Sequence, residues 1–294
     1  MRAQNRAYLF GLAAVLLWST VASAFKLTLK YVDPIQLLFY SNLFSTIVLA
    51  AILVWGGKLR SVLSGTRREY TRSVLLGALN PALYYLVLFK AYDLLPAQEA
   101  QPLNYTWGIV LPILSIPLLG QRMSRPDAAA LVLGYAGVIV ISTHGNLTSF
   151  RLSQPFGVAL ALGSAFVWAL YWILHTKDTR DPVVCLFLSF ASGLPLTFLL
   201  CLFLSSLRIG SVEGLAGTVY VGCFEMSVTF VLWLLALRSS ENTAKTSMLI
   251  FVSPFFSLVP IHYIVGEKIL PSTIAGLSLI VAGLVIQRQR KSSG

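Results

Sequence analysis

Long apolar stretches separated by short polar breaks run through the whole chain. A helix that crosses a bilayer needs about 20 apolar residues, because the hydrocarbon core is about 30 Å thick and the backbone must satisfy its own hydrogen bonds there. Ten stretches meet this requirement, with proline, glycine or charged residues at the breaks. The predicted spans are Ala7–Leu29, Ile35–Trp55, Arg72–Tyr92, Ala97–Leu119, Asp127–Ser142, Pro155–His175, Pro182–Leu204, Glu213–Leu237, Asn242–Ile264 and Leu270–Gln287. The pattern predicts an all-α integral membrane protein with one transmembrane domain, residues 1–294.

Composition agrees with a lipid environment. Of the 294 residues, 56% are hydrophobic and only 11% are charged, whereas about 25% of the residues in a soluble domain are charged. The aliphatic and aromatic content excludes a disordered chain. Three cysteines, all within apolar runs, are too few for a disulfide scaffold.

The distribution of basic residues predicts the orientation. The net charge of +11 would suggest nucleic acid as a partner of a soluble protein, but here the basic residues lie mostly between the spans. Sixteen of the 22 Lys and Arg residues lie on the side of the N-terminus, so we expect both termini to be cytoplasmic and nucleic acid not to bind. Ala22-Ser23-Ala24 mimics a signal-peptide cleavage site, but the preceding apolar run exceeds the usual length of about 7 to 15 residues, so we expect this helix to be retained.

A weak internal repeat divides the chain into two halves. Gly120-Gln121-Arg122 matches Gly266-Glu267-Lys268 at a separation of 146, and Ala136-Gly137 matches Ala282-Gly283 at the same separation. Trp18 matches Trp168 at a separation of 150. The halves, residues 1–146 and 150–291, then hold five helices each. Since five is odd, the halves cross the membrane in opposite senses, and such inverted repeats place the substrate near the midplane between them.

These motifs resemble the ten-helix EamA-type transporters of the drug/metabolite transporter superfamily. The resemblance rests on Gly266-Glu267-Lys268, on the Leu277–Ile286 run with Ala282-Gly283, and on their echoes at Gly120-Gln121-Arg122 and Gly134-Tyr135-Ala136-Gly137. Gln121 stands where that family usually has Glu, so the acid occurs once here. Trp18-Ser19, Asn104–Trp107 and the many aromatic residues look like the branch of aromatic amino-acid exporters. The resemblance implies an exporter of aromatic and other neutral amino acids in the cell inner membrane, with a central cavity.

Polar and aromatic side chains within the spans are candidates for substrate binding. Polar groups at this depth should face protein or water, and an amide beside an indole suits a zwitterion with an apolar side chain. Spacing places Asn80 and Tyr84 on one face of the third span, and Trp18 and Trp168 correspond in the repeat. Near the end of the sixth span, Tyr171, Trp172 and His175 suggest an aromatic belt. The substrate-binding candidates are Trp18, Asn80, Tyr84, Gln101, Asn104, Tyr105, Trp107, Trp168 and Glu225.

Glu225 is the most informative single residue because it lies near the middle of the eighth span. A carboxylate at that depth costs about 2.5 to 3.5 kcal/mol on insertion scales, so it is a functional candidate. Three roles remain open. Glu225 could bind the substrate ammonium, carry a proton that couples export to the proton gradient, or make a structural bond to a neighbouring helix. Glu267, before the last span, is expected to complement the dipole of that helix.

Other functions fit the sequence less well. No HExxH, aspartate-rich or phosphate-cradling motif is present, which argues against an enzyme. A channel would need similar groups along a pore, and a multidrug cation exporter would need an acid, for which Glu225 is the one candidate. His144 and His262 have no metal-ligand spacing, so neither metal nor cofactor is expected. The sequence therefore predicts a secondary transporter acting by alternating access, as a monomer or weak dimer in the lipid bilayer. Exporters of other small metabolites or lipophilic cationic drugs, and less so an intramembrane enzyme, are the alternatives.

Overall fold

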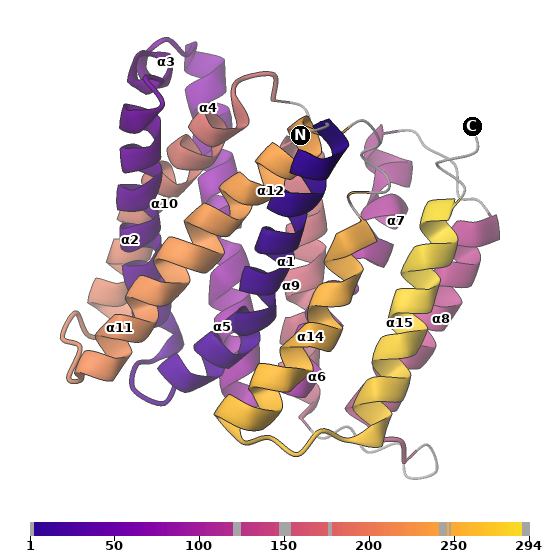
Figure 1. Ribbon diagram of the computed structural model, residues 1–294. Coiled ribbons are helices and arrows are strands. Elements are labelled where there is room, and N and C mark those ends of the chain that lie inside the picture. Colours follow the sequence, from indigo (N-terminus) through magenta and orange to yellow (C-terminus); the bar gives the residue numbers. More distant parts are fainter. Residues whose placement is uncertain are drawn as a thin grey trace.

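The protein is a bundle of helices that lie side by side (Figure 1). The computed structural model describes residues 3–119, 125–146, 154–175, 178–240, 246 and 248–289, and every regular element among them is helical. In chain order these are α1 (Ala3–Thr28), α2 (Pro34–Trp55), α3 (Leu59–Leu63), α4 (Arg67–Gly77), η1 (Ala78–Leu83), α5 (Tyr84–Leu94), α6 (Ala97–Tyr105), α7 (Trp107–Leu119), α8 (Arg125–Ser142), α9 (Pro155–His175), α10 (Pro182–Leu204), α11 (Val212–Tyr220), η2 (Val221–Val228), α12 (Thr229–Arg238), η3 (Met248–Val252), α14 (Ser253–Pro260), η4 (Ile261–Val265) and α15 (Pro271–Gln289).

Six continuous helical segments are long and apolar enough to cross a membrane. They are Gln4–Thr28, Pro34–Trp55, Arg67–Leu94, Pro155–His175, Pro182–Leu204 and Val212–Arg238. Three shorter apolar helices cover Ala128–Ser142, Ser253–Val265 and Pro271–Ile286. The predicted span Ala97–Leu119 is divided at Thr106 into α6 and α7. An all-helical membrane protein is therefore the architecture of the described chain.

Two helices begin at Asp-Pro pairs that mark breaks in the sequence. The Asp33 carboxylate accepts hydrogen bonds from the backbone N–H groups of Ile35 (2.8 Å) and Gln36 (3.0 Å) at the start of α2. Asp181 does the same for Val183 (2.9 Å) at the start of α10. In each case the following proline stands in the first helical turn, where no intrahelical N–H bond is lost. These pairs fix where α2 and α10 begin.

Helices α8 and α15 cross at close range through glycines. A Cβ added at Gly137 would lie 2.5 Å from the carbonyl oxygen of Gly276, and one at Gly276 would lie 2.6 Å from that of Gly137. Gly283 packs in the same interface, against the backbone of Ala130. Small residues allow the two backbones to approach, which strengthens van der Waals packing where the hydrophobic effect contributes little. Both Ala-Gly pairs, at residues 136–137 and 282–283, therefore contribute a glycine to the α8–α15 interface, Gly137 against Gly276 and Gly283 against Ala130.

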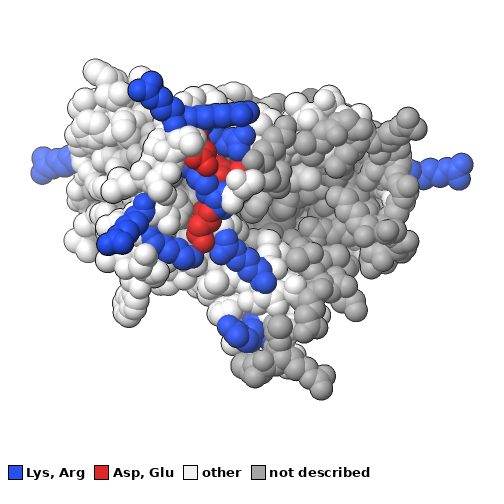
Figure 2. All heavy atoms as spheres, turned by 90° about the horizontal axis from the view of Figure 1, so that it is seen from above, with Lys and Arg blue, Asp and Glu red and all other residues white. Residues whose placement is uncertain are grey.

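Basic side chains gather at the end of the bundle where α1 begins, which we call the basic end. Figure 2 views the molecule from this end and shows Lys and Arg spread over the described part of the face, with a few acids near its middle. Ion pairs and hydrogen bonds join segments near the start of α10. Asp181 pairs with Lys58 (2.8 Å) and Arg238 (3.3 Å), and the Arg180 guanidinium donates to Asp178 (2.7 Å) and to Ser73 in α4 (2.8 Å).

At the opposite end, the loop before α15 holds the start of α6. The Glu267 carboxylate accepts from the backbone N–H groups of Ala97 (2.7 Å) and Gln98 (3.1 Å). The Gln98 side chain in return accepts from the Leu270 N–H (2.9 Å) at the start of α15. Glu267 therefore complements the dipole at the N-terminus of α6, and the expectation that it serves the last helix is wrong. The positive end of α6 lies beside it because the two segments, distant in sequence, meet here.

We expect the α8–α15 crossing to tolerate no added methyl group. The Cβ of Gly137→Ala would contact a backbone oxygen, which cannot move aside as a side chain does, so the free energy of unfolding should fall by about 1–3 kcal/mol. Unfolding with SDS in mixed micelles measures this. Gly163→Ala in α9 is the matched control, because nothing lies within 4 Å of its added Cβ. Equal stability of the two variants would contradict the packing argument.

We expect the Asp178–Arg180 pair to make stability depend on pH. Hydrogen bonds from Arg180 hold the pKa of the buried Asp178 carboxyl well below its usual range. A depressed pKa contributes stability that is present above the unfolded value of about 3.9 and is lost as the pH falls through the folded value. Asp178→Asn should lower the free energy of unfolding by about 1.5–3 kcal/mol at pH 7, with a smaller difference below about pH 4. Asp93→Asn, which removes an exposed pair with Lys90, should change it by less than about 1 kcal/mol. Thermal unfolding across pH compares the two.

Candidate functional site

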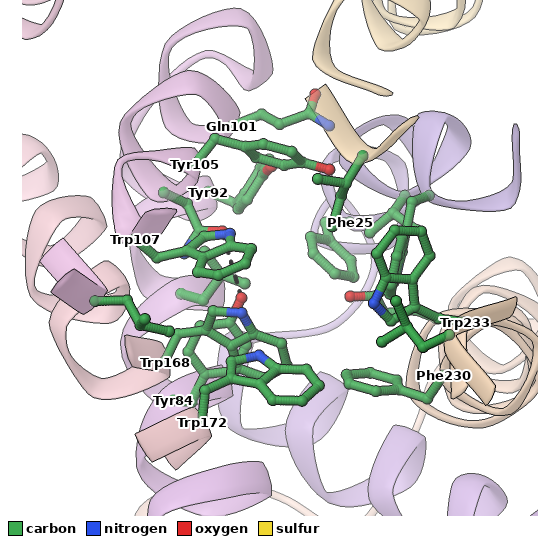
Figure 3. A pocket seen from close by; sticks show the side chains of 18 residues that line it. Phe25, Tyr84, Tyr92, Gln101, Tyr105, Trp107, Trp168, Trp172, Phe230 and Trp233 are labelled. Atoms are coloured by element: carbon green, nitrogen blue, oxygen red, sulfur yellow. Dashed lines mark hydrogen bonds between the residues drawn. The ribbon is translucent and has the colours of Figure 1, made fainter. Parts of the chain in front are cut away.

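A cavity of about 240 Å³ lies between helices from the first and second parts of the chain. Its lining comes from α1, α5, α6 and α7 and from α9, η2, α12 and η3. Figure 3 shows aromatic rings pointing into it from all sides. Protein cavities of this kind commonly bind small molecules, and their known volumes begin at about 300 Å³. The size therefore suits a ligand of one ring system rather than a large one.

Eight of the nine predicted residues line this cavity. They are Trp18, Tyr84, Gln101, Asn104, Tyr105, Trp107, Trp168 and Glu225. Asn80 is the exception: it is fully buried but is absent from the lining. The backbone of Asn80 has φ −143° and ψ 115°, so a break in the helix separates it from Tyr84. The prediction for Asn80 assumed continuous helical spacing, which this break removes.

Trp18 and Trp168 both pack against Phe230. The ring centroids of Trp18 and Phe230 are 5.9 Å apart, and those of Trp168 and Phe230 are 5.6 Å apart, both with edge-on geometry. Tyr84 stacks on Trp168 at 4.5 Å, and Trp233 lies 5.5 Å from Trp18. Such aromatic pairs are worth about 0.5–1.5 kcal/mol beyond the area they bury. They hold the walls of the cavity in a fixed arrangement.

Asn104 links three helices through its amide. Its Nδ2 donates to the Ser164 hydroxyl in α9 (2.9 Å), and its Oδ1 accepts from the Tyr84 hydroxyl in α5 (3.4 Å). Ser164 in turn donates to the Ala161 carbonyl (2.6 Å). All of these groups are buried, where an unmatched polar atom would cost about 1–3 kcal/mol. The amide of Asn104 is therefore engaged in positioning α6 against α5 and α9.

Glu225 is the only acidic residue in the described lining of the cavity. It is only 7% exposed. Its Oε1 accepts from the Tyr85 hydroxyl (3.3 Å), and the indole of Trp18 also interacts with the carboxylate. Its Oε2 makes no hydrogen bond within the described chain. One carboxylate oxygen is therefore held by protein and the other is unmatched.

Irregular backbone lies next to the polar residues of the cavity. Tyr84 directly follows η1, Thr106 separates Tyr105 from Trp107, and Glu225 lies within the π-helical turns of η2. Single π-helical turns are frequent at functional sites, and non-helical backbone at membrane depth is tolerated where protein or a cavity surrounds it. Because the helices are interrupted at these points, regular helical spacing does not give the directions of the side chains beyond each interruption.

Several lining residues were not predicted from the sequence. Trp172 was expected in an interfacial belt, yet it lines the cavity, and Tyr171 beside it is buried. The belt prediction is wrong because α5, α6 and α7 cover the face of α9 that carries these rings. Phe230 and Trp233 were missed as well. Regular helical spacing places Trp233 on the same face of the eighth predicted span as Glu225, and this was the one indication in the sequence that Trp233 could line the site.

The structure provides no evident metal site in the part of the chain it describes. No group of three or more His, Cys, Asp or Glu side chains there could hold an ion. The one close acid–histidine contact in the described chain joins Glu99 to His144 (2.7 Å), away from the cavity lining.

The sequence model of the EamA-like transporter family matches the chain twice, at residues 5–143 and 155–287. The chain belongs to the EamA-like transporter family. The two matched segments both contribute to the cavity, since α1, α5, α6 and α7 lie in the first and α9, η2, α12 and η3 in the second.

Relatives of this EamA-like transporter carry different names. An "Uncharacterized transporter" of Archaeoglobus fulgidus is 24% identical over 96% of this chain and 97% of its own. The "Probable terminal-alkyne amino-acid exporter" of Streptantibioticus cattleyicolor is 26% identical over 83% and 82%. The "Aromatic amino acid exporter YddG" of Ancylobacter novellus is 26% identical over 61% of each chain. One solved crystal structure has the same fold, with a TM-score of 0.68, 21% identity and full coverage of both chains.

In this EamA-like transporter we expect Asn104 and Tyr84 to be energetically coupled. Asn104→Leu leaves the Tyr84 and Ser164 hydroxyls without their amide partner, which should lower the free energy of unfolding by about 1–3 kcal/mol. In a Tyr84→Phe background one of those hydroxyls is absent, so the same substitution should cost at least about 0.5 kcal/mol less. SDS unfolding of the four proteins completes the double-mutant cycle. Strictly additive effects would show that the hydrogen bond contributes nothing.

Proposed function

We propose that this EamA-like transporter is a secondary transporter that exports aromatic and other neutral amino acids across the inner membrane. In this proposal the cavity binds the amino acid and opens alternately to the two sides as the halves of the chain move against each other. The observation that carries the proposal is the lining itself, in which aromatic rings surround one unmatched carboxylate oxygen. Rings can pack an apolar side chain while the carboxylate binds the ammonium group.

The names of two relatives support the substrate class. One is named an aromatic amino acid exporter and the other a probable terminal-alkyne amino-acid exporter. Both names describe amino acids whose side chains are uncharged. A cavity of about 240 Å³ without a described basic residue in its lining is compatible with that class and unsuited to large phosphorylated ligands.

We propose further that the architecture is ten spanning helices in two inverted halves, residues 1–146 and 150–291. The double match of the family model supports two halves. The directions of the helices support inversion, because α1 begins at the basic end whereas α9, the first helix of the second half, ends there (Figure 1). The excess of basic side chains at that end supports its placement in the cytoplasm, with both termini, and we propose a monomer or weak dimer.

Proton coupling through Glu225 is part of this proposal. The carboxyl group is buried, and it faces the same cavity as the proposed substrate. A group in this position can hold a proton when the ammonium is absent and release it when the ammonium binds. Competition of this kind would exchange protons for substrate.

Transport in liposomes tests the proposal. Labelled phenylalanine, tryptophan, threonine and methionine should be taken up into vesicles with reconstituted protein, and faster with an imposed pH gradient. Glu225→Gln should reduce phenylalanine uptake at least about tenfold, a loss of about 1.4 kcal/mol in interaction, and remove the dependence on the gradient. Glu213→Gln, the same substitution at an exposed acid in the first turn of α11, is the matched control and should behave as the unmodified protein.

Two results would contradict the proposal. If none of the four amino acids moves while a lipophilic cation does, the substrate class is wrong. If Glu225→Gln keeps both full transport and its pH dependence, Glu225 has no part in coupling.

A further inference from the structure

Two buried acceptor oxygens of the cavity lining have no hydrogen-bond partner in the described chain. Gln101 Oε1 and Glu225 Oε2 line the cavity, are buried, and make no hydrogen bond within the described chain. The Asn104 amide, by contrast, is already used on both sides by Ser164 and Tyr84. Unmatched buried acceptors are satisfied by a ligand that donates hydrogen bonds. An ammonium group, with three N–H donors, suits an unmatched carboxylate oxygen such as Glu225 Oε2.

No matching charge for a ligand carboxylate is found in the described lining. Glu225 is the only Asp, Glu, Lys, Arg or His residue in the described lining. A buried unmatched donor, the indole N–H of Trp172, is neutral, as are the other side-chain donors of the described lining. Lys26, in α1, uses its ammonium group on the carbonyl oxygens of Tyr92 and Leu95, both at 2.7 Å. A buried carboxylate without a charged partner carries a desolvation penalty that one neutral donor offsets only in part.

The aromatic walls add to the preference for a cation. Trp18, which interacts with the Glu225 carboxylate, has its ring beside those of Phe230 and Trp233. A cation within about 6 Å of such a ring is attracted to its face, and the attraction is stronger where water is excluded. Figure 3 shows the rings of Phe230 and Trp233 on one side of the cavity. An ammonium group bound at Glu225 would therefore lie against aromatic faces.

We propose that the cavity recognises its ligand through an ammonium group and one aromatic ring and needs no carboxylate, so that primary arylalkylamines are substrates of this transporter. The inference rests on the proposed function, since it concerns the same cavity, and it names the chemical class more narrowly. Amino acids then bind as amines that carry an additional carboxylate. The carboxylate of the amino acid adds little to its binding affinity in this cavity.

Equilibrium binding distinguishes the ammonium from the carboxylate. Purified full-length protein is incubated with tritiated phenethylamine in a scintillation proximity assay, which is insensitive to leakage of amines through lipid. Phenylalanine, phenylalaninamide and 3-phenylpropionate then compete. We expect phenethylamine and phenylalaninamide to bind at least as tightly as phenylalanine, and 3-phenylpropionate at least about 30-fold more weakly, about 2 kcal/mol.

Substitutions at Glu225 assign the effect to the carboxylate. Glu225→Gln should weaken phenethylamine binding at least about tenfold, whereas Glu225→Asp, which keeps the charge, should retain more of it. Glu213→Gln lies outside the cavity and should bind phenethylamine as the unmodified protein does. Near-ultraviolet circular dichroism shows whether each variant keeps its fold. Equal binding by Glu225→Gln and the unmodified protein would overturn the inference.

Direct binding of tritiated phenylalanine makes the two proposals fail separately. If phenylalanine binds and phenethylamine does not, the inference is wrong and the proposed amino-acid transport stands. If phenethylamine binds and phenylalanine does not, the inference stands and the proposed substrate is wrong. Tight binding of 3-phenylpropionate would overturn the inference, and binding of none of these ligands would overturn both.

Discussion

A bilayer offers no water to a backbone N–H or C=O group, so every interruption of a spanning helix must find its partners inside the protein. The interruptions of this chain obey that constraint by gathering around one place. The break at Asn80, the break at Thr106 and the π-helical turns of η2 all lie beside residues of the same cavity. At these three places irregular backbone stands next to the cavity, where it affects the directions of the lining side chains.

Packing around this centre depends on two kinds of contact that the bilayer favours. Gly137 and Gly276 bring α8 and α15 to backbone contact, which dispersion forces reward. Polar contacts join segments far apart in the chain, as where Glu267 accepts from the first N–H groups of α6. An acid at that position interacts favourably with the positive end of the helix dipole. The helix that carries Gln101 and Asn104 is thus held at its outer end by residues from the other half.

The charge of the cavity comes from Glu225, whose carboxylate has a hydrogen-bond partner in the described protein for only one of its two oxygens. Tyr85 holds one oxygen of Glu225, the other has no partner in the described chain, and no basic side chain of the described lining neutralises it. A permanent internal ion pair would have made the site neutral and closed to charged ligands. An unmatched acid among aromatic rings instead suits a cationic group.

The sequence by itself determined the apolar helices and which residues gather at the cavity, because hydrophobic length and a deep acid are local properties of the chain. Eight predicted residues line one cavity, since polar and aromatic groups at membrane depth have few other places to go. Only the tertiary structure decided that Asn80 lies off the lining, that Trp172 lies on it, and that Glu267 serves α6. Each of these depends on a helix break or on a contact between segments far apart in sequence, such as α9 against α5. Helical periodicity assumes a continuous helix and carries no information about neighbouring segments. It therefore predicts neither the helix breaks nor the contacts between distant segments.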